Sequence, residues 1–208
     1  NSTCKEHGIC VLGGDTKEHD EIVISGTALG KVKKNGILTR AGAMAGDVIG
    51  VTGKIGSAAA GFYCLTRGIS QPRFIEAALE PKARVKEGKI LSRYASSAID
   101  ISDGLAFSLH EIAEKSNAGF KIYEERVPAE DDIKRVSKLA DVPVTEMIFH
   151  KGGDFELLFT APEEKFSELE RKIDVTEIGE VIDSGAVIVK EGRELELGAH
   201  GYDSFWFR

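Results

Sequence analysis

The sequence predicts an α+β fold, in which helices pack on a mixed or antiparallel sheet. Strand-length apolar runs and helical apolar stripes both occur, and they follow one another without strict alternation or internal repeats. The chain has 208 residues, of which 42% are hydrophobic and 29% charged, as is ordinary for a globular protein. Glycine, at 23 residues, is the outlier and indicates many tight turns or close backbone approaches.

Charge and apolar patterning exclude several classes of protein. The 27 basic and 34 acidic residues give a formal net charge of −7, which argues against a general nucleic-acid binder. No run approaches the roughly 18 apolar residues that cross a bilayer, so no membrane partner is expected. The three cysteines form no C-x-x-C pair, and the first residues carry no signal-peptide pattern, which together predict a reducing, cytoplasmic location.

From their sequence, we expect residues 1–47 to contain the end of one structural unit and a linker that follows it. Residues 1–10 read as the end of a helix, in which Gly8 is a typical helix stop after Lys5, Glu6 and His7. With Asn1 in first position we expect a fragment of a longer chain. Residues 9–12 predict a short buried strand and residues 21–28 a second strand. Residues 30–47 show little periodicity and predict a linker between two domains.

The remaining residues predict the main α+β domain. Residues 48–52 predict a strand that ends in a glycine-rich turn, after which Ser57 is expected to cap a helix over residues 58–66. The best-defined helix covers residues 103–116, where four residues form one apolar stripe: Leu105, Leu109, Ile112 and Ala113. We expect further helices at residues 73–79, 83–94, 129–139 and 163–172, and further strands at residues 98–101, 120–123, 156–160, 175–182 and 186–190.

Acidic residues occur in three glycine-containing turns at the ends of expected strands. These turns are residues 13–16 (Gly-Gly-Asp-Thr), 100–104 (Asp-Ile-Ser-Asp-Gly) and 152–156 (Gly-Gly-Asp-Phe-Glu). Turn chemistry alone explains each of them, because Asp bonds to turn backbone and Gly tolerates a positive φ. A purely structural role is therefore the simplest interpretation of any one of these turns.

The turn at residues 100–104 has a second interpretation. Asp100 stands in an otherwise apolar strand, where a buried carboxylate needs a partner, and Asp103 or Ser102 would cap the following helix. Mg²⁺ is a suitable partner, because it takes one or two carboxylates together with water and phosphate oxygens. The helix amino terminus would add N–H groups for a phosphate. The structural and the functional interpretation both stay open.

Other candidate groups carry a weaker signal. Arg40 could clamp a phosphate with its planar guanidinium, although a lone Arg in a linker also serves as a solvated charge. Cys4, His7 and Cys10 are spaced C-x-x-H-x-x-C, so a zinc site is conceivable, but this ligand spacing is unusual. His110 is expected to pack or to face solvent. The sequence contains no P-loop, nucleophile-elbow or zinc-protease motif.

In order and spacing, the motifs resemble those of the thiamine-monophosphate kinase family, in the aminoimidazole-ribonucleotide-synthetase-like superfamily. The resemblance covers nearly the whole chain. Each motif is weak alone, but the complete set in this order is specific. The matching segments are residues 12–16, 24–30, 39–43, 46–47, 51–53, 58–61, 98–105, 153–159 and 201–203.

The resemblance implies a PurM-like fold and an ATP- and Mg²⁺-dependent phosphorylation of thiamine monophosphate to thiamine diphosphate. Residues 1–35 would be a remnant of the amino-terminal ATP-binding domain, and residues 36–208 the carboxy-terminal domain of a homodimer. The family's site residues carry over as metal ligands at Asp15, Asp100 and Asp103, as ATP contacts at Gly14, Asp15, Arg40 and Ser102, and as a thiamine contact at Tyr202. Transfer between phosphates needs positioning and charge neutralisation more than a strong base, which suits a set of aspartates.

Two departures from the family pattern keep other functions open. The family often has Gly-Gly-Glu-Asp where residues 151–154 read Lys-Gly-Gly-Asp, so Gly153 stands at the position of the acidic substrate contact. The family's upstream motifs, which form most of the nucleotide site, are missing from this sequence. The alternatives are another enzyme of the superfamily, of the hydrogenase-maturation or purine-synthesis type, and a non-catalytic fragment or binding domain.

Overall fold

The computed structural model describes residues 2–202, which fall into two compact units divided between Ile37 and Leu38. The first unit is mostly irregular. Its α1 (Ser2–Glu6) ends before Gly8, whose φ of +69° stops the helix as the sequence predicts, and η1 (Lys34–Gly36) is a single 3₁₀ turn.

The two strands predicted in the first unit are wrong. Residues 9–12 and 21–28 are irregular and exposed, with Leu12 exposed to 88% and Ile22 to 94%. An apolar run becomes a buried strand only when a partner strand pairs with it and another layer covers it. The described residues of this unit provide neither of these.

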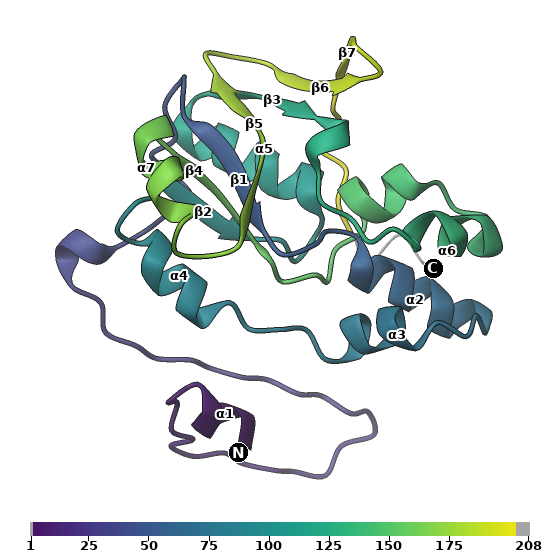
Figure 1. Ribbon diagram of the computed structural model, residues 1–208. Coiled ribbons are helices and arrows are strands. Elements are labelled where there is room, and N and C mark those ends of the chain that lie inside the picture. Colours follow the sequence, from purple (N-terminus) through teal and green to yellow (C-terminus); the bar gives the residue numbers. More distant parts are fainter. Residues whose placement is uncertain (1, 203–208) are drawn as a thin grey trace. The chain divides into compact units, whose positions relative to one another are not determined.

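The second unit is built on a sheet of seven described strands in the order β2-β4-β1-β5-β3-β6-β7 (Figure 1). Neighbouring strands are antiparallel except β3 and β6, which run parallel, so the predicted mixed α+β sheet is confirmed. The strands are β1 (Val48–Thr52), β2 (Ser97–Asp100), β3 (Gly119–Tyr123), β4 (Leu157–Ala161), β5 (Val175–Ile182), β6 (Ala186–Lys190) and β7 (Arg193–Glu196).

Helices of the second unit cover both faces of the sheet. The helices are α2 (Ser57–Arg67), α3 (Pro72–Leu79), α4 (Val85–Leu91), α5 (Leu105–Ser116), α6 (Ile133–Ala140) and α7 (Glu163–Leu169), with short turns η2 (Glu124–Arg126) and η3 (Glu146–His150). Along β4, Leu158 belongs to the larger core with α5, whereas Phe159 packs in a smaller core with Phe166 of α7. Because successive side chains of a strand point to opposite faces, α5 and α7 cover opposite sides of the sheet.

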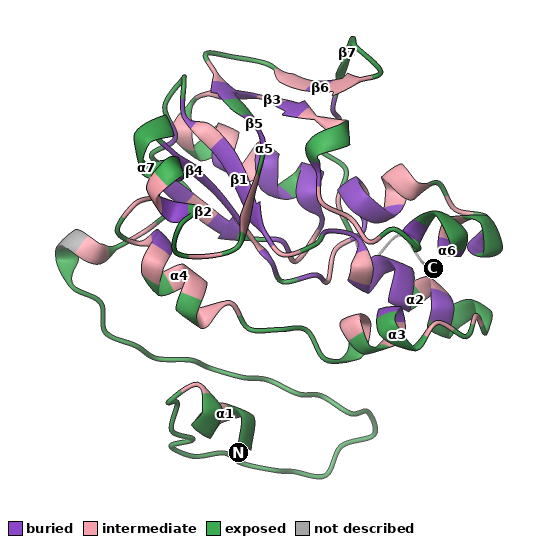
Figure 2. Cartoon of the chain, in the orientation of Figure 1, coloured by how far each residue is buried: buried purple, intermediate pink, exposed green. Residues whose placement is uncertain are grey.

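The burial pattern explains which elements were predictable. Buried residues concentrate in β1, β4, α2 and α5, and all four elements match the sequence expectation to within a few residues (Figure 2). Helices α4, α6 and α7 are shorter than predicted. Sequence analysis missed β7 and the π-helical turn η3. The Arg-Glu-Leu-Glu sequence of β7 is exposed throughout, so it lacks the apolar alternation by which a strand is recognised. No helix within residues 2–202 has the length and apolar character to cross a membrane.

Helices α2 and α3 pack unusually closely at Gly61. A Cβ atom at Gly61 would lie 1.9 Å from the carbonyl oxygen of Phe74, so only glycine allows this approach. Gly68 ends α2 in the left-handed conformation, and Pro72 starts α3 at a position where its missing N–H costs nothing. Residues of both helices line the pocket that is described below.

We expect the Gly61→Ala substitution to lower the free energy of unfolding by about 2–3 kcal/mol, because the added methyl group forces the two helices apart. Gly88→Ala in α4 is the matched control. Its Cβ would meet its nearest neighbour, Leu157, at an ordinary 3.7 Å, so alanine there should be neutral or stabilise by up to about 1 kcal/mol. Urea unfolding measures the change in the free energy of unfolding for both variants. Equal changes would contradict the close packing of α2 and α3 at Gly61.

Candidate functional site

Two of the predicted acidic turns lie side by side at one end of the sheet. β2 runs antiparallel to β4 with Asp100 opposite Leu157, so the turn that leaves β2 meets the loop that enters β4. Backbone hydrogen bonds join them: the N–H of Gly153 donates to the Ser102 carbonyl at 2.9 Å, and that of Phe155 to the Ile101 carbonyl at 3.1 Å. The sequence did not show this pairing, because the two turns are separated by about 50 residues.

Gly152 makes the contact between the two turns possible. A Cβ atom at this position would lie 1.8 Å from the carbonyl oxygen of Ser102 and 2.7 Å from Cα of Asp103. The next residue, Gly153, has a φ of +98° that other residues rarely adopt. The glycine pair is therefore required by geometry, one residue for space and the other for its backbone conformation.

The segment after β7 adds a third part to the same place. The N–H of Tyr202 donates to the Asp103 carbonyl at 2.8 Å, and a ring nitrogen of His150 lies 2.9 Å from the His200 carbonyl oxygen. At the start of this segment, Nε2 of His110 lies 2.7 Å from the Leu197 carbonyl oxygen. Asp203, the last residue of the Gly-Tyr-Asp motif, lies outside the described residues.

These three segments, α2 and α3 form a pocket of about 330 Å³. The pocket brings together three of the predicted site residues, Ser102, Gly153 and Tyr202. Its wall is otherwise largely apolar, formed by Ala58, Phe62, Leu65, Ala78, Leu79 and Phe155, and it also includes Lys151 and Gly152. Such a pocket, apolar with a few polar groups at defined places, is typical of small-molecule sites.

The two aspartates of the turn at residues 100–104 differ from expectation in their surroundings. Asp100 was expected to be buried, but it is exposed, because it ends β2, which is an edge strand. The predicted helix cap by Ser102 or Asp103 is also wrong: Gly104 holds the N-cap position of α5, and Ser102 Oγ donates instead to Asp103 Oδ2 at 2.8 Å.

The carboxylates of this turn are of the ligand type that Mg²⁺ prefers. Asp100 and Asp103 present two carboxylates three residues apart, and Mg²⁺ binds one or two protein carboxylates and completes its shell with water and phosphate oxygens. Among residues 2–202, no group of three or more His, Cys, Asp or Glu side chains is arranged to hold a metal ion. The zinc site considered at Cys4, His7 and Cys10 is therefore not formed there.

The other predicted ATP contacts are divided between the two units. Gly14 and Asp15 belong to the first unit, where Asp15 is exposed and pairs with Lys17 at 3.4 Å. Arg40 belongs to the second unit, and its guanidinium forms an ion pair with Glu111 of α5 at 2.7 Å. Arg40 does not line the pocket that contains Ser102, Gly153 and Tyr202.

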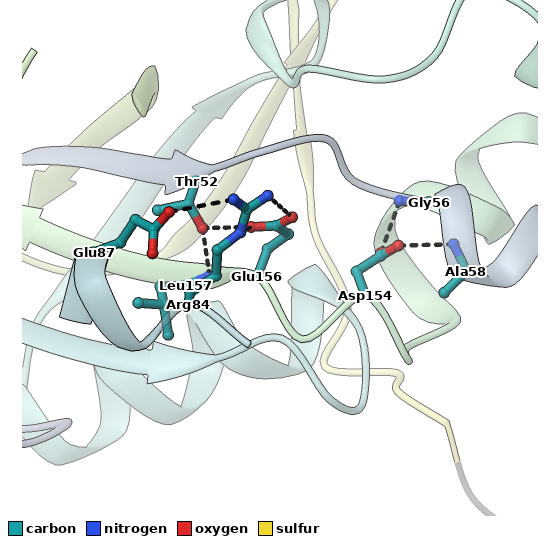
Figure 3. A network of polar contacts seen from close by, with 8 residues as sticks. All are labelled: Thr52, Gly56, Ala58, Arg84, Glu87, Asp154, Glu156 and Leu157. Carbon is teal, nitrogen blue, oxygen red and sulfur yellow. Dashed lines mark hydrogen bonds and ion pairs between the residues drawn. The ribbon is translucent and has the colours of Figure 1, made fainter. Parts of the chain in front are cut away.

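The sequence did not reveal the role of Asp154, a buried acidic residue of the turn at residues 152–156 (Figure 3). Its two carboxylate oxygens accept hydrogen bonds from the backbone N–H groups of Gly56 at 2.8 Å and Ala58 at 2.9 Å, so Asp154 caps α2. Ser57, the expected cap, is instead the first residue of α2, and Gly56 holds the N-cap position. Burial raises the pKa of Asp154 to about 6, against the lowering effect of the hydrogen bonds from Ala58 and Gly56.

Glu156 anchors a second polar network two residues further along (Figure 3). It accepts from Thr52 Oγ1 at 2.6 Å and from two guanidinium nitrogens of Arg84, both at 2.6 Å. The hydrogen bond to Glu156 is also the main cause that raises the pKa of Arg84. The pair is partly buried, and the network links the loop that enters β4 to β1 through Thr52 and to the segment before α4 through Arg84.

Comparison with known proteins identifies the family. The family model for the C-terminal domain of AIR synthase related proteins matches residues 44–191. The thiamine-monophosphate kinase of Pyrococcus abyssi is 43% identical over 197 residues, which cover 94% of this chain and 61% of that protein. The thiamine-monophosphate kinase of Bacillus subtilis is 30% identical, with 99% of this chain and 67% of that protein covered. The chain belongs to the thiamine-monophosphate kinase family.

Solved structures agree with this family assignment. The structure of AaThiL in complex with AMPPCP and TMP has a TM-score of 0.69 at 29% identity, and the match covers 81% of this chain and 54% of that one. Escherichia coli HypE has a TM-score of 0.78 over 95% of this chain and 65% of its own, but at 19% identity it shows only that the fold is shared. The expected PurM-like fold is confirmed. The chain spans 61% of the length of its Pyrococcus relatives.

The raised pKa of Asp154 predicts a defined pH dependence of stability. Between its ordinary value of 3.8 and about 6, the folded state holds a proton on Asp154 that the unfolded state has released. Its contribution to stability is therefore full below about pH 4 and is lost as the pH rises through 6, by up to about 3 kcal/mol. Urea unfolding of the parent chain and of the Asp154→Asn variant, at pH values from about 4 to above 6, measures this effect. The difference in the free energy of unfolding between the two proteins should change by that amount over this range. A difference that stays constant between these pH values would contradict the raised pKa.

The close contact at Gly152 predicts that its replacement costs more than that of its neighbour. Gly152→Ala places a methyl group against the Ser102 carbonyl and should lower the free energy of unfolding by at least about 2 kcal/mol. Gly153→Ala has room beside Ala58 and should cost only the backbone strain, about 1 kcal/mol. Thermal unfolding of both variants tests this order, and the reverse order would disagree with the described contact.

Proposed function

We propose that the protein phosphorylates thiamine monophosphate with ATP and Mg²⁺, yielding thiamine diphosphate and ADP. One observation carries the proposal: beside the carboxylate of Asp103, the pocket gathers Ser102 and Tyr202, to which the family's site residues carry over, and Gly153, which stands at the position of the family's acidic substrate contact. The family assignment and the AaThiL complex with AMPPCP and TMP support it, since those ligands are an ATP analogue and the proposed substrate.

The described side chains suit this reaction. The acceptor is already a phosphate anion, so the site must position two anionic groups and neutralise their charge rather than remove a proton. Asp100 and Asp103 would hold the Mg²⁺, which supplies that neutralisation when bound, and Ser102 would orient the nucleotide. The apolar pocket wall and Tyr202 would receive the organic part of the acceptor and exclude water from it.

On the nucleotide side, the proposal extends to Gly14, Asp15 and Arg40. Residues 1–35 would belong to the ATP-binding domain of the family, with Asp15 as a further metal ligand and Arg40 exchanging Glu111 for a phosphate. Arg40 is half exposed and its pair with Glu111 is a surface ion pair, which costs little to open. A homodimer remains a prediction from the family resemblance, and a cytoplasmic location remains a prediction from the cysteine pattern.

The direct experiment is to incubate the 208-residue chain with Mg²⁺, ATP and thiamine monophosphate and to detect thiamine diphosphate by mass. We expect product, and we expect Asp103→Asn to lower kcat/KM by at least about 100-fold, because an amide holds Mg²⁺ poorly next to two phosphates. Asp183→Asn, at an exposed turn between β5 and β6, is the matched control and should leave kcat/KM unchanged. Absence of product, or equal rates for both variants, would contradict the proposed function of this chain.

A further inference from the structure

Residues 197–202 form a strap that leads from the end of β7 to the pocket, where Tyr202 is part of the wall. The strap has no helical or strand structure. Its first residue, Leu197, is buried, whereas Ala199 and His200 are exposed. A segment that buries little apolar surface opens easily unless hydrogen bonds hold it. The place of Tyr202 in the wall therefore depends on the groups that bond to the strap.

Two histidine rings bond to carbonyl oxygens of the strap. Nε2 of His110, in α5, lies 2.7 Å from the Leu197 carbonyl oxygen. Nδ1 of His150, in η3, lies 2.9 Å from the His200 carbonyl oxygen. Because a carbonyl oxygen only accepts, each of these ring nitrogens carries a proton and donates it. The strap is thus held by a side chain at its first residue and again two residues before Tyr202.

The elements that carry the two histidines also lead to the two turns of the site. α5 starts directly after the acidic turn at residues 100–104, and η3 leads into the loop that contains Gly152 and Gly153. The ring of His110 packs edge-on against the buried ring of Phe120, with the centroids 5.1 Å apart, and this contact orients its donor. Each histidine therefore joins the strap to an element whose position is already fixed relative to the site.

We propose that His110 and His150 are positioning residues, which hold Tyr202 in place for the acceptor substrate by fixing the strap. The assignment rests on the proposed function in one respect, that the pocket receives thiamine monophosphate. The described residues that line the pocket do not include either histidine, so both act through the strap. A wall that is ordered beforehand spares the ligand the entropy cost of ordering it, so both bonds raise the affinity for the acceptor. None of the proposed ATP contacts belongs to the strap.

Two pairs of variants test the proposal through KM and kcat of the 208-residue chain. His110→Leu and His150→Leu remove the donor and keep much of the side-chain bulk. We expect each to raise KM for thiamine monophosphate about fivefold, as the loss of one hydrogen bond would, with kcat and the KM for ATP changed by less than about twofold. His110→Gln keeps an N–H donor near the place of Nε2 and His150→Asn near that of Nδ1, so both should stay close to the parent. Ser137→Ala is the matched control, because it loses a bond from Oγ to the Val142 carbonyl, away from the strap, and should change none of these values.

Two further measurements show whether the histidines act through Tyr202. In a Tyr202→Ala background, His150→Leu should raise KM for thiamine monophosphate no further, because the ring that the strap positions is gone. Without any ligand, the backbone amide hydrogen of Tyr202, which bonds to the Asp103 carbonyl, should exchange with solvent about fivefold faster in the two leucine variants than in the parent. Additive effects on KM, or unchanged exchange, would overturn the proposal.

The possible outcomes separate this proposal from the proposed function. Calorimetric titration with thiamine monophosphate takes the place of KM if the parent chain makes no product. If the chain binds thiamine monophosphate with the expected dependence on the two histidines but makes no thiamine diphosphate, the proposed function alone fails. If the leucine variants lower the thermal stability and leave this affinity unchanged, or if the parent chain does not bind thiamine monophosphate, the histidines are merely structural and the proposal is wrong.

Discussion

The buried carboxylate of Asp154 ties the pocket to the fold. It lies on the loop that enters β4, and it accepts the first N–H groups of α2, which lack partners inside the helix. One face of α2 carries Phe62 and Leu65 into the pocket, and the same loop carries Lys151 and Gly153. Because an unpaired buried carboxylate is costly, helix and loop hold each other in one relative position. The shape of the pocket depends on that position.

The sheet supplies the second requirement of the site. Antiparallel pairing of β2 with β4 brings the end of one strand beside the start of the other, and the glycine pair at residues 152 and 153 lets the two turns touch. The segment of residues 197–202 then returns from β7 and adds Tyr202 through a bond to the same turn. Three stretches far apart in the chain thus share one set of backbone hydrogen bonds. These backbone hydrogen bonds therefore hold the side chains of Ser102 and Tyr202 on the same pocket wall.

Local patterns predicted the elements whose burial is regular. β1 and α5 have apolar residues at strand and helix spacing, and both occur where expected. The same patterns failed at residues 9–12 and 21–28, since apolar composition does not reveal whether a partner strand exists. The order of the motifs indicated Ser102, Asp103 and Tyr202 as candidate site residues, but it did not show that they lie close together. The roles of Asp154 and Glu156 could not be read at all, because their partners Gly56 and Arg84 lie about 100 and 70 residues away in the sequence.

The separation of the pocket's segments along the chain has a consequence for folding. Residues near positions 60, 78, 102, 152 and 202 all contribute to its wall, so no contiguous part of the chain can form it early. Loop-closure entropy makes contacts of this range slow to form, and the cavity appears only when nearly the whole second unit has assembled. A ligand that fills it binds the native state alone. It therefore stabilises the unit by RT ln(1 + [L]/Kd), and a saturating ligand concentration lowers the unfolded population and slows degradation that begins from unfolded chains.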